Sequence, residues 1–292
     1  MRVLGLVGSA RRLGNTEILV KDALMSAAAA GADAELVRLS DLRIKPCNGC
    51  MACVFKESDC VLDDDLYFLL EQMQRADGIV LGAPVYFFGA PGTIKMIVDR
   101  FLVVKPGQFD GRKAVTLGVA GQSKWARMFM PQLNLLPLAA GHDVVASVLF
   151  ESPGPGEVLL NPDNTRRAEE LGRALVAAIQ GATSEPHSIS SECPICRGTA
   201  FRLKSSTRVE CPLCYTEGEI VELDGKVAVR FDLETLKFRY FGEETRADHF
   251  ENWVKRTGPR FRQHVREVLA ARKRYEDLPI RWVKPETGSS SP

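Results

Sequence analysis

Four cysteines stand close together in the run CNGCMACVFKESDC: Cys47, Cys50, Cys53 and Cys60. Their spacing, C-x2-C-x2-C-x6-C, allows one loop to bring all four thiolates to a single inorganic centre. Compact runs with two-residue gaps are typical of iron–sulfur loops, whereas structural zinc sites usually take two C-x2-C pairs that lie well apart in sequence. The spacing therefore favours an iron–sulfur cluster, of the [4Fe-4S] type, over zinc, redox disulfides or unliganded thiols.

A second set of four cysteines has a different spacing, with Cys193 and Cys196 in CPIC and Cys211 and Cys214 in CPLC. The pattern C-x2-C-x14-C-x2-C is close to that of zinc ribbons, in which two knuckles offer two thiolates each to one tetrahedral Zn²⁺. We expect structural zinc here, with a rubredoxin-like iron site as the alternative. Because thiolates would fill all four positions, the metal would activate no water and would serve to stabilise a small module.

The composition sets limits on the class of protein. The 292-residue chain is long enough for about two domains, and its 45% apolar and 26% charged residues are ordinary for a globular protein. No apolar run reaches the roughly 20 residues that cross a bilayer, and a net charge of +1 gives no argument for nucleic acid. The start MRVLGLVGSA predicts a strand and not an export signal. We therefore expect a cytoplasmic protein with no membrane partner, whose two cysteine quartets bind metal in a reducing compartment.

An anion site is expected near the start of the chain. Residues 2–7 form an apolar run typical of a buried parallel strand, the loop GSARRLGNT follows, and a helical pattern runs from 16 to 30. A loop between a buried strand and a helix N-terminus offers unpaired N–H groups and a favourable dipole to a phosphate. Since neither GxxxxGK[ST] nor GxGxxG is present, the phosphate monoester FMN is the expected ligand, with an ordinary polar turn as the alternative. The side chains expected to hold this phosphate are Ser9, Arg11, Asn15 and Thr16.

Further strands are predicted at 33–40, 78–84, 113–120 and 142–150, followed by a closing helix at 161–180. Strands that alternate with helices predict an α/β fold, with a doubly wound parallel sheet of five strands in flavodoxin-like order. The strand at 78–84 runs into the aromatic stretch APVYFFGAPGTIKMIVDR. That stretch would lie at the carboxyl edge of the sheet, where open α/β sheets bind ligands.

The rest of the chain predicts a smaller module. Residues 181–192 have the small, polar composition of a linker. We expect a zinc ribbon and β-hairpin at 193–245, because EIVELDGKVAVRFD alternates around Asp224-Gly225, and LKFRYFGEE predicts a third strand. Residues 246–292 predict a basic terminal helix and tail. Such a helix could bind nucleic acid, but a solvated face or an acidic partner is favoured.

Residues 1–180 resemble the iron–sulfur flavoproteins, a branch of the NAD(P)H-dependent FMN reductase group within the flavodoxin-like superfamily. The resemblance is carried by GSARRLGNT, by the cysteine loop 47–60 and by GAPVYFFGAPGTIKMIVDR, in that order, and SPGPGEV before the closing helix also fits. It implies bound FMN, a [4Fe-4S] cluster on the first quartet, and a homo-oligomer such as a dimer or tetramer. The residues it places around the flavin, beyond the four at the phosphate, are Pro84, Val85, Tyr86, Phe87, Gly89, Ala120 and Gly121.

The sequence departs from this family in VAGQSKWARM, which is less glycine-rich than the corresponding loop of these reductases. Gln122, Lys124 and Trp125 are therefore expected to narrow the open face of the flavin, although Trp125 is also consistent with a partly buried surface anchor.

The expected activity is that of a flavin-dependent reductase, in which the cofactors carry the electrons and the protein positions them. Electrons would pass from a ferredoxin-like donor or NAD(P)H to a small-molecule acceptor over the flavin, such as a quinone, nitro compound, peroxide or activated alkene. Tyr86 is a candidate proton donor because of its position alone. The alternatives are an electron-transfer flavoprotein without its own substrate, and a redox-sensing regulator that uses the zinc ribbon and basic helix.

Overall fold

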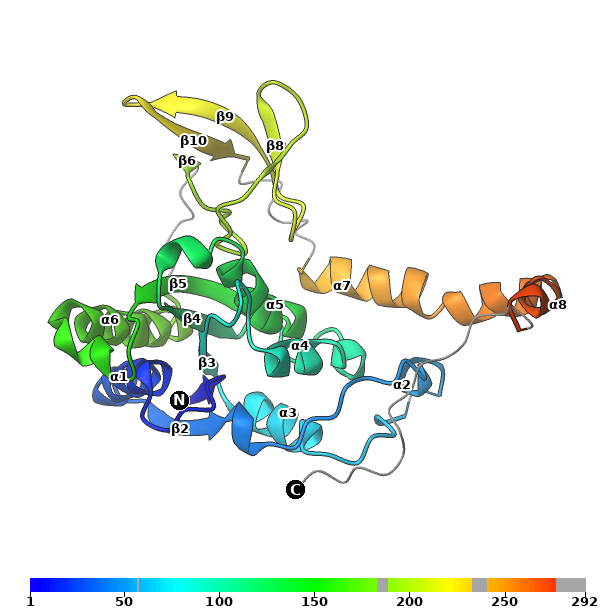
Figure 1. The fold of residues 1–292 in the computed structure, drawn as a ribbon, viewed down its shortest axis with the longest axis horizontal. Helices are drawn as coiled ribbons and strands as arrows, with labels where there is room; N and C mark the ends of the chain where they lie inside the picture. The colour runs from blue at the N-terminus through cyan, green and yellow to red at the C-terminus, as the bar shows by residue number, and fades with distance from the viewer. Residues whose placement is uncertain (57, 183–188, 233–240, 277–292) are drawn as a thin grey trace.

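The computed structural model describes residues 1–56, 58–182, 189–232 and 241–276. Its larger sheet has five parallel strands in the order β2-β1-β3-β4-β5, which confirms the flavodoxin-like order predicted from the sequence (Figure 1). The strands are β1 (Arg2–Val7), β2 (Asp33–Arg38), β3 (Gly78–Pro84), β4 (Lys113–Ala120) and β5 (Asp143–Glu151).

Helices cover both faces of this sheet because its strands are apolar on both faces. The longer helices are α1 (Asn15–Ala29), α3 (Leu66–Arg75), α4 (Gly92–Val98), α5 (Phe129–Ala140) and α6 (Pro162–Ile179). Successive residues of β1 point to opposite sides, so that Val3 joins a core with α1 and α6, and Leu4 joins a core with α3, α4 and α5. Short helical turns complete the connections: η1 (Leu39–Asp41), α2 (Ala52–Phe55), η2 (Phe101–Val103), η3 (Ser123–Trp125) and η4 (Glu157–Leu160).

A second, antiparallel sheet lies beyond β5 and α5, with the order β6-β10-β9-β8-β7 (Figure 1). The expected hairpin is present, and Asp224 and Gly225 take the positive φ angles, 51° and 74°, that a tight two-residue turn requires. β6 falls inside the segment 181–192, where a linker was expected. Most of the third strand expected in LKFRYFGEE lies outside the described residues. The strands are β6 (Ile189–Ser190), β7 (Arg202–Leu203), β8 (Arg208–Glu210), β9 (Glu217–Leu223) and β10 (Lys226–Phe231).

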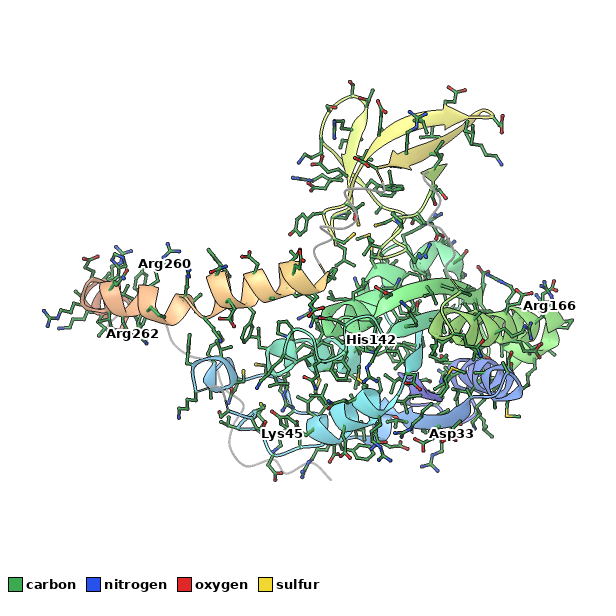
Figure 2. All side chains as sticks on the ribbon, turned by 180° about the vertical axis from the view of Figure 1, so that it is seen from behind. Asp33, Lys45, His142, Arg166, Arg260 and Arg262 are labelled. Carbon is green, nitrogen blue, oxygen red and sulfur yellow. The ribbon has the colours of Figure 1, made fainter. Side chains whose placement is uncertain are left out.

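A helical arm projects from the body after the second sheet (Figure 1). It consists of α7 (Glu243–His249), a π-helical turn (Phe250–Val254) and α8 (Thr257–Glu276). Arg246 in α7 forms an ion pair with Asp110 in the body, and Figure 2 shows Arg260 and Arg262 on the outer part of the arm. Within the described ranges, no helix combines the length and the apolar character that a membrane span would need.

His142 is a buried titratable side chain between α5 and β5, inside the body of the protein (Figure 2). Its ring stacks on that of Phe109, with 5.6 Å between the ring centroids. Burial, together with the positive charge of Arg112, lowers the pKa of His142 from 6.5 to about 3. The ring is therefore neutral in the folded protein throughout the physiological range.

This neutral ring makes stability sensitive to acid. Above about pH 6.5 the ring is neutral in both states, and it adds no pH dependence. As the pH falls from about 6.5 towards 3, the unfolded chain binds a proton that the folded chain excludes, so the free energy of unfolding decreases by up to about 1.4 kcal/mol per pH unit. We expect His142→Leu to lose this slope in urea unfolding between about pH 6 and pH 4. The matched control His264→Leu, at an exposed histidine of the arm, should keep the slope, and an unchanged slope in His142→Leu would contradict the assignment.

Candidate functional site

A cavity of about 250 Å³ opens at the carboxyl ends of β1, β3, β4 and β5, at the edge predicted to bind a ligand. Eight of the eleven residues predicted to hold the flavin line it: Ser9, Arg11, Asn15, Thr16, Pro84, Val85, Tyr86 and Gly121. Of the other three, Ala120 is buried in β4, and Phe87 and Gly89 lie in the turn that follows β3. The cavity also includes residues outside that prediction: Gly14, Val119, Ser152, Pro153 and Pro155.

One end of the cavity is the N-terminus of α1, which suits an anion. The helix begins after Gly14, which has no side chain to cap it, so the first N–H groups have no partner within the helix. The hydroxyl of Ser9 accepts a hydrogen bond from the N–H of Arg11 at 3.2 Å, and the Arg11 side chain is exposed beside it. Unpaired N–H groups, hydroxyls and a guanidinium at one point form a donor set for phosphate.

Asn15, which lines the cavity, also makes hydrogen bonds to the loop after β5. Its side-chain amide donates to the carbonyl of Gly154 at 2.8 Å and to the hydroxyl of Ser152 at 3.0 Å. Its side-chain oxygen accepts from the N–H of Val158 at 3.3 Å. Asn15 therefore ties the start of α1 to the loop after β5, and the two walls of the cavity are held together by this residue.

The buried carboxylate of Glu17 braces the loop between β1 and α1. Glu17 accepts a hydrogen bond from the N–H of Leu13 at 3.0 Å and forms ion pairs with Lys21 and Arg38. Burial alone would raise the pKa of Glu17, but the hydrogen bonds from Lys21 and Leu13 and the charge of Arg38 lower it below its ordinary value. The sequence gives no long-range signal for this brace, because Arg38 comes from β2.

Exposed aromatic side chains occur around the turn that adjoins the cavity at Tyr86. Tyr86 lines the cavity and is about half exposed, and the exposed ring of Trp125 lies nearby on η3. The rings of Phe88 and Trp125 are 5.9 Å apart between centroids. Gln122, Lys124 and Trp125, which were expected to narrow the open face, are all exposed in the loop after β4.

The first cysteine quartet lies on the loop between η1 and α3, around the short helix α2. Cys47 and Cys50 are exposed, and Cys53 and Cys60 are half-buried. Burial raises the pKa of the Cys53 thiol, and the charges of the other three cysteines raise it further. Their sulfur atoms do not converge to the spacing of one ion, because the second quartet is the only such group found among the described residues.

Arg100 and Asp64 fix the end of this loop. Both side chains are buried and form an ion pair, and the Arg100 guanidinium also donates to the sulfur of Cys60 at 3.2 Å. Asp64 accepts from the N–H of Lys45 at 2.7 Å, which closes the loop on itself. Burial alone would raise the pKa of Asp64, but hydrogen bonds from Arg100 and the backbone lower it. Arg100 ends the motif GAPVYFFGAPGTIKMIVDR, but the sequence alone does not predict its contact with Cys60.

The second quartet gathers tightly. All four sulfur atoms of Cys193, Cys196, Cys211 and Cys214 lie within 4.8 Å of one another, and all four residues are buried. The Cys193–Cys214 and Cys196–Cys211 sulfurs are 3.2 and 3.4 Å apart. A tetrahedral ion with bonds of about 2.3 Å needs sulfurs about 3.8 Å apart, so a small adjustment would seat one ion. The predicted four-cysteine metal site is therefore confirmed as an arrangement of ligands.

A buried polar network joins this site to the larger sheet. The side-chain amide of Asn134, on α5, donates to the carbonyl of Cys196 at 2.7 Å. Its side-chain oxygen accepts from the hydroxyl of Thr116 in β4 at 2.6 Å, and Ser147 in β5 bonds to both. The four cysteines belong to the same apolar core as α3, α4 and α5. The second module is thus packed into the first and not tethered beside it.

Comparison with known proteins shows what the chain is similar to. A family model described as NADPH-dependent FMN reductase matches residues 1–150. An iron-sulfur flavoprotein of Methanocaldococcus jannaschii is 44% identical over 120 residues, which are 41% of this chain and 61% of that protein. The flavone synthase cfoJ of Aspergillus candidus is 32% identical over 272 residues, 82% of this chain and 84% of that protein.

The likeness of the fold extends over the whole chain. A solved structure titled flavone reductase superposes with a TM-score of 0.78 at 24% identity, and it covers 98% of this chain and 100% of its own. The C-terminal module is therefore part of a shared architecture, whereas the archaeal relative is matched over 41% of this chain.

The Asn134 network should contribute strongly to stability. Asn134→Leu keeps the branched shape of the side chain but leaves the buried Cys196 carbonyl without its donor, while the Thr116 hydroxyl keeps its bond to Ser147. We expect a loss of about 1–3 kcal/mol, the cost of one unsatisfied buried group. The control Asn252→Leu, on the exposed face of the arm, should change stability by less than about 0.5 kcal/mol. Urea unfolding measures both, and equal effects in the two variants would contradict the importance of the network.

Proposed function

Because the chain belongs to the NADPH-dependent FMN reductase family, we propose that it is an FMN-dependent reductase of planar, conjugated carbonyl compounds of the flavone type. It takes its electrons from NAD(P)H and delivers them to the acceptor at the carboxyl edge of the parallel sheet. The observation that carries this proposal is the cavity there, which combines phosphate donors with the aromatic side chain of Tyr86 and is followed in the chain by the exposed rings of Phe87 and Phe88.

The residues of the cavity fit FMN. The uncapped N-terminus of α1, the hydroxyls of Ser9 and Thr16 and the guanidinium of Arg11 would hold the phosphate. The backbone from Pro84 to Tyr86 and Gly121 would flank the flavin ring. When bound, FMN supplies the exchange of two electrons between NAD(P)H and a second molecule.

The compound class is taken from the relative that matches most of the chain. The fungal protein named flavone synthase is 32% identical over 82% of this chain, and its name gives a flavone as the product. It therefore supports the flavone type as the compound bound, while the direction of reduction follows from the FMN reductase family and from the activated alkene among the acceptors expected from the sequence. Saturation of such a double bond consumes two electrons and two protons: NAD(P)H supplies a hydride, water supplies a proton, and NAD(P)⁺ is released. Tyr86, which lines the cavity, is our candidate for passing that proton.

The two cysteine quartets have different proposed occupants. The neighbouring but dispersed thiols of the first quartet would hold a [4Fe-4S] cluster, which passes single electrons and so suits a ferredoxin-like donor as well. Arg100, which donates to Cys60, would stabilise a thiolate ligand there. The buried, tight second quartet would hold structural Zn²⁺.

FMN affinity tests the assignment of the phosphate end. Arg11 lines the cavity and Arg12 does not, although both are exposed arginines in the same loop. Loss of a charged hydrogen bond of about 1.5–3 kcal/mol should weaken FMN binding by roughly 10- to 100-fold in Arg11→Ala. Arg12→Ala should retain wild-type affinity. The measurement is a titration of FMN fluorescence, and equal affinities in the two variants would count against this phosphate site.

The reaction itself is tested without oxygen. Protein loaded with FMN is mixed with NADPH and flavone, and the products are separated by liquid chromatography. We expect one saturated product per NADPH consumed, with no product when FMN or NADPH is left out. Oxidation of NADPH only after air is admitted, with flavone recovered unchanged, would overturn the proposed acceptor class.

A further inference from the structure

The turn that follows β3 has an unusual sequence for its geometry. The N–H of Tyr86 donates to the carbonyl of Gly89 at 2.9 Å, and the N–H of Gly89 donates back to the carbonyl of Tyr86 at 3.1 Å. The two residues between them, Phe87 and Phe88, both have positive φ angles, 45° and 70°. Turns of this kind favour Asn-Gly or Gly-Gly, because a bulky side chain is disfavoured at positive φ. The turn therefore retains two phenylalanines against a local conformational preference.

Burial within this chain does not explain the two phenylalanines. The side chain of Phe87 is 96% exposed, and that of Phe88 is 53% exposed, so neither gains much from the apolar core. The turn is instead held from behind, where the side-chain oxygen of Gln132 on α5 accepts a hydrogen bond from the N–H of Ala90 at 3.1 Å. Strained residues that persist without stabilising the fold occur mainly at functional sites.

A third ring completes an exposed aromatic surface at this place. Trp125 on η3 is 54% exposed, and its ring lies 5.9 Å from that of Phe88 between centroids. Phe87 meets Phe88 edge to face, with 5.6 Å between centroids. We call Phe87, Phe88 and Trp125 the aromatic wall. It adjoins the cavity through Tyr86, which precedes the turn and lines the cavity.

We propose that the aromatic wall is the subsite that selects planar, uncharged aromatic acceptors. An acceptor with fused and pendant aryl rings would stack on the faces of Phe88 and Trp125, with Phe87 at its outer edge, while its reactive bond extends into the cavity. Offset and edge-to-face packing of aromatic rings is favourable and requires no hydrogen bonds. Reduction of the acceptor at this subsite rests on the proposed function, whereas binding of the acceptor to the aromatic wall does not.

The test replaces the turn with the sequence that its geometry prefers. Phe87→Asn combined with Phe88→Gly should raise the midpoint of thermal unfolding by about 2 °C or more, because the conformational strain is removed. The same variant should bind flavone at least about tenfold more weakly relative to 1,4-benzoquinone, which has no aryl substituent to stack. Binding is followed on the oxidised, FMN-loaded protein by the change in the flavin spectrum, so that no turnover is needed.

Two further variants make the result decisive. Trp125→Leu, which leaves the turn intact, should lower the selectivity for flavone over benzoquinone in the same direction. Phe68→Ala removes another half-exposed phenylalanine, on α3, and should leave the selectivity unchanged. If wild-type protein binds flavone and the wall variants lose it, the subsite stands even where no reduction is seen. Unchanged selectivity for flavone over benzoquinone in the wall variants would overturn the subsite. If those variants instead changed the oligomeric mass, the aromatic wall would be assigned to contact between copies of the chain.

Discussion

Helix α5 is the element on which both halves of the molecule depend, because three nearby side chains make contacts in different directions. Gln132 holds the turn after β3, Asn134 bonds to the second cysteine site and to β4, and Pro131 packs so closely on Gly198 that a Cβ there would lie 3.2 Å from it. A fully buried amide with every partner satisfied is stabilising, and the same amide without them is costly. The second module therefore contacts the same helix that holds the turn after β3.

Buried ion pairs likewise stabilise two loops, the one after β1 and the one that carries the first cysteine quartet. Glu17 and Arg38 hold the loop between β1 and α1. Asp64 and Arg100 hold the end of the cysteine loop. Burying one charge alone would be strongly unfavourable, so each pair keeps its loop in one arrangement as long as both members are present. Loops are normally the more mobile parts of a protein. Arg38, at the end of β2, connects the first loop to the sheet, and Arg100, just after α4, connects the second loop to the end of that helix.

The sequence predicts most of the sheet, because apolar runs such as GIVLGAP specify buried parallel strands without reference to other parts of the chain. It also predicts the second cysteine site, whose ligands are fixed by spacing, and the Asp224-Gly225 hairpin, which depends on local conformation. Contacts between residues far apart in the chain are not predicted in this way. Nothing local indicates that Arg100 bonds to Cys60, that Asn15 is occupied by the loop after β5, or that Asn134 joins the two modules. The sequence does not predict the strained turn at Phe87 and Phe88, because phenylalanine is disfavoured at the positive φ angles that this turn requires.

We propose that one chain brings together FMN, a redox cluster on the first quartet and a structural ion on the second. Metal, sulfide and flavin analysis of one anaerobically purified sample, with its visible spectrum, tests this claim most directly. We expect about four iron and four sulfide per chain, about one zinc and one FMN. Two zinc ions with no sulfide would remove the cluster from the first quartet, and a sample that neither contains nor takes up FMN would contradict the assignment of the cavity.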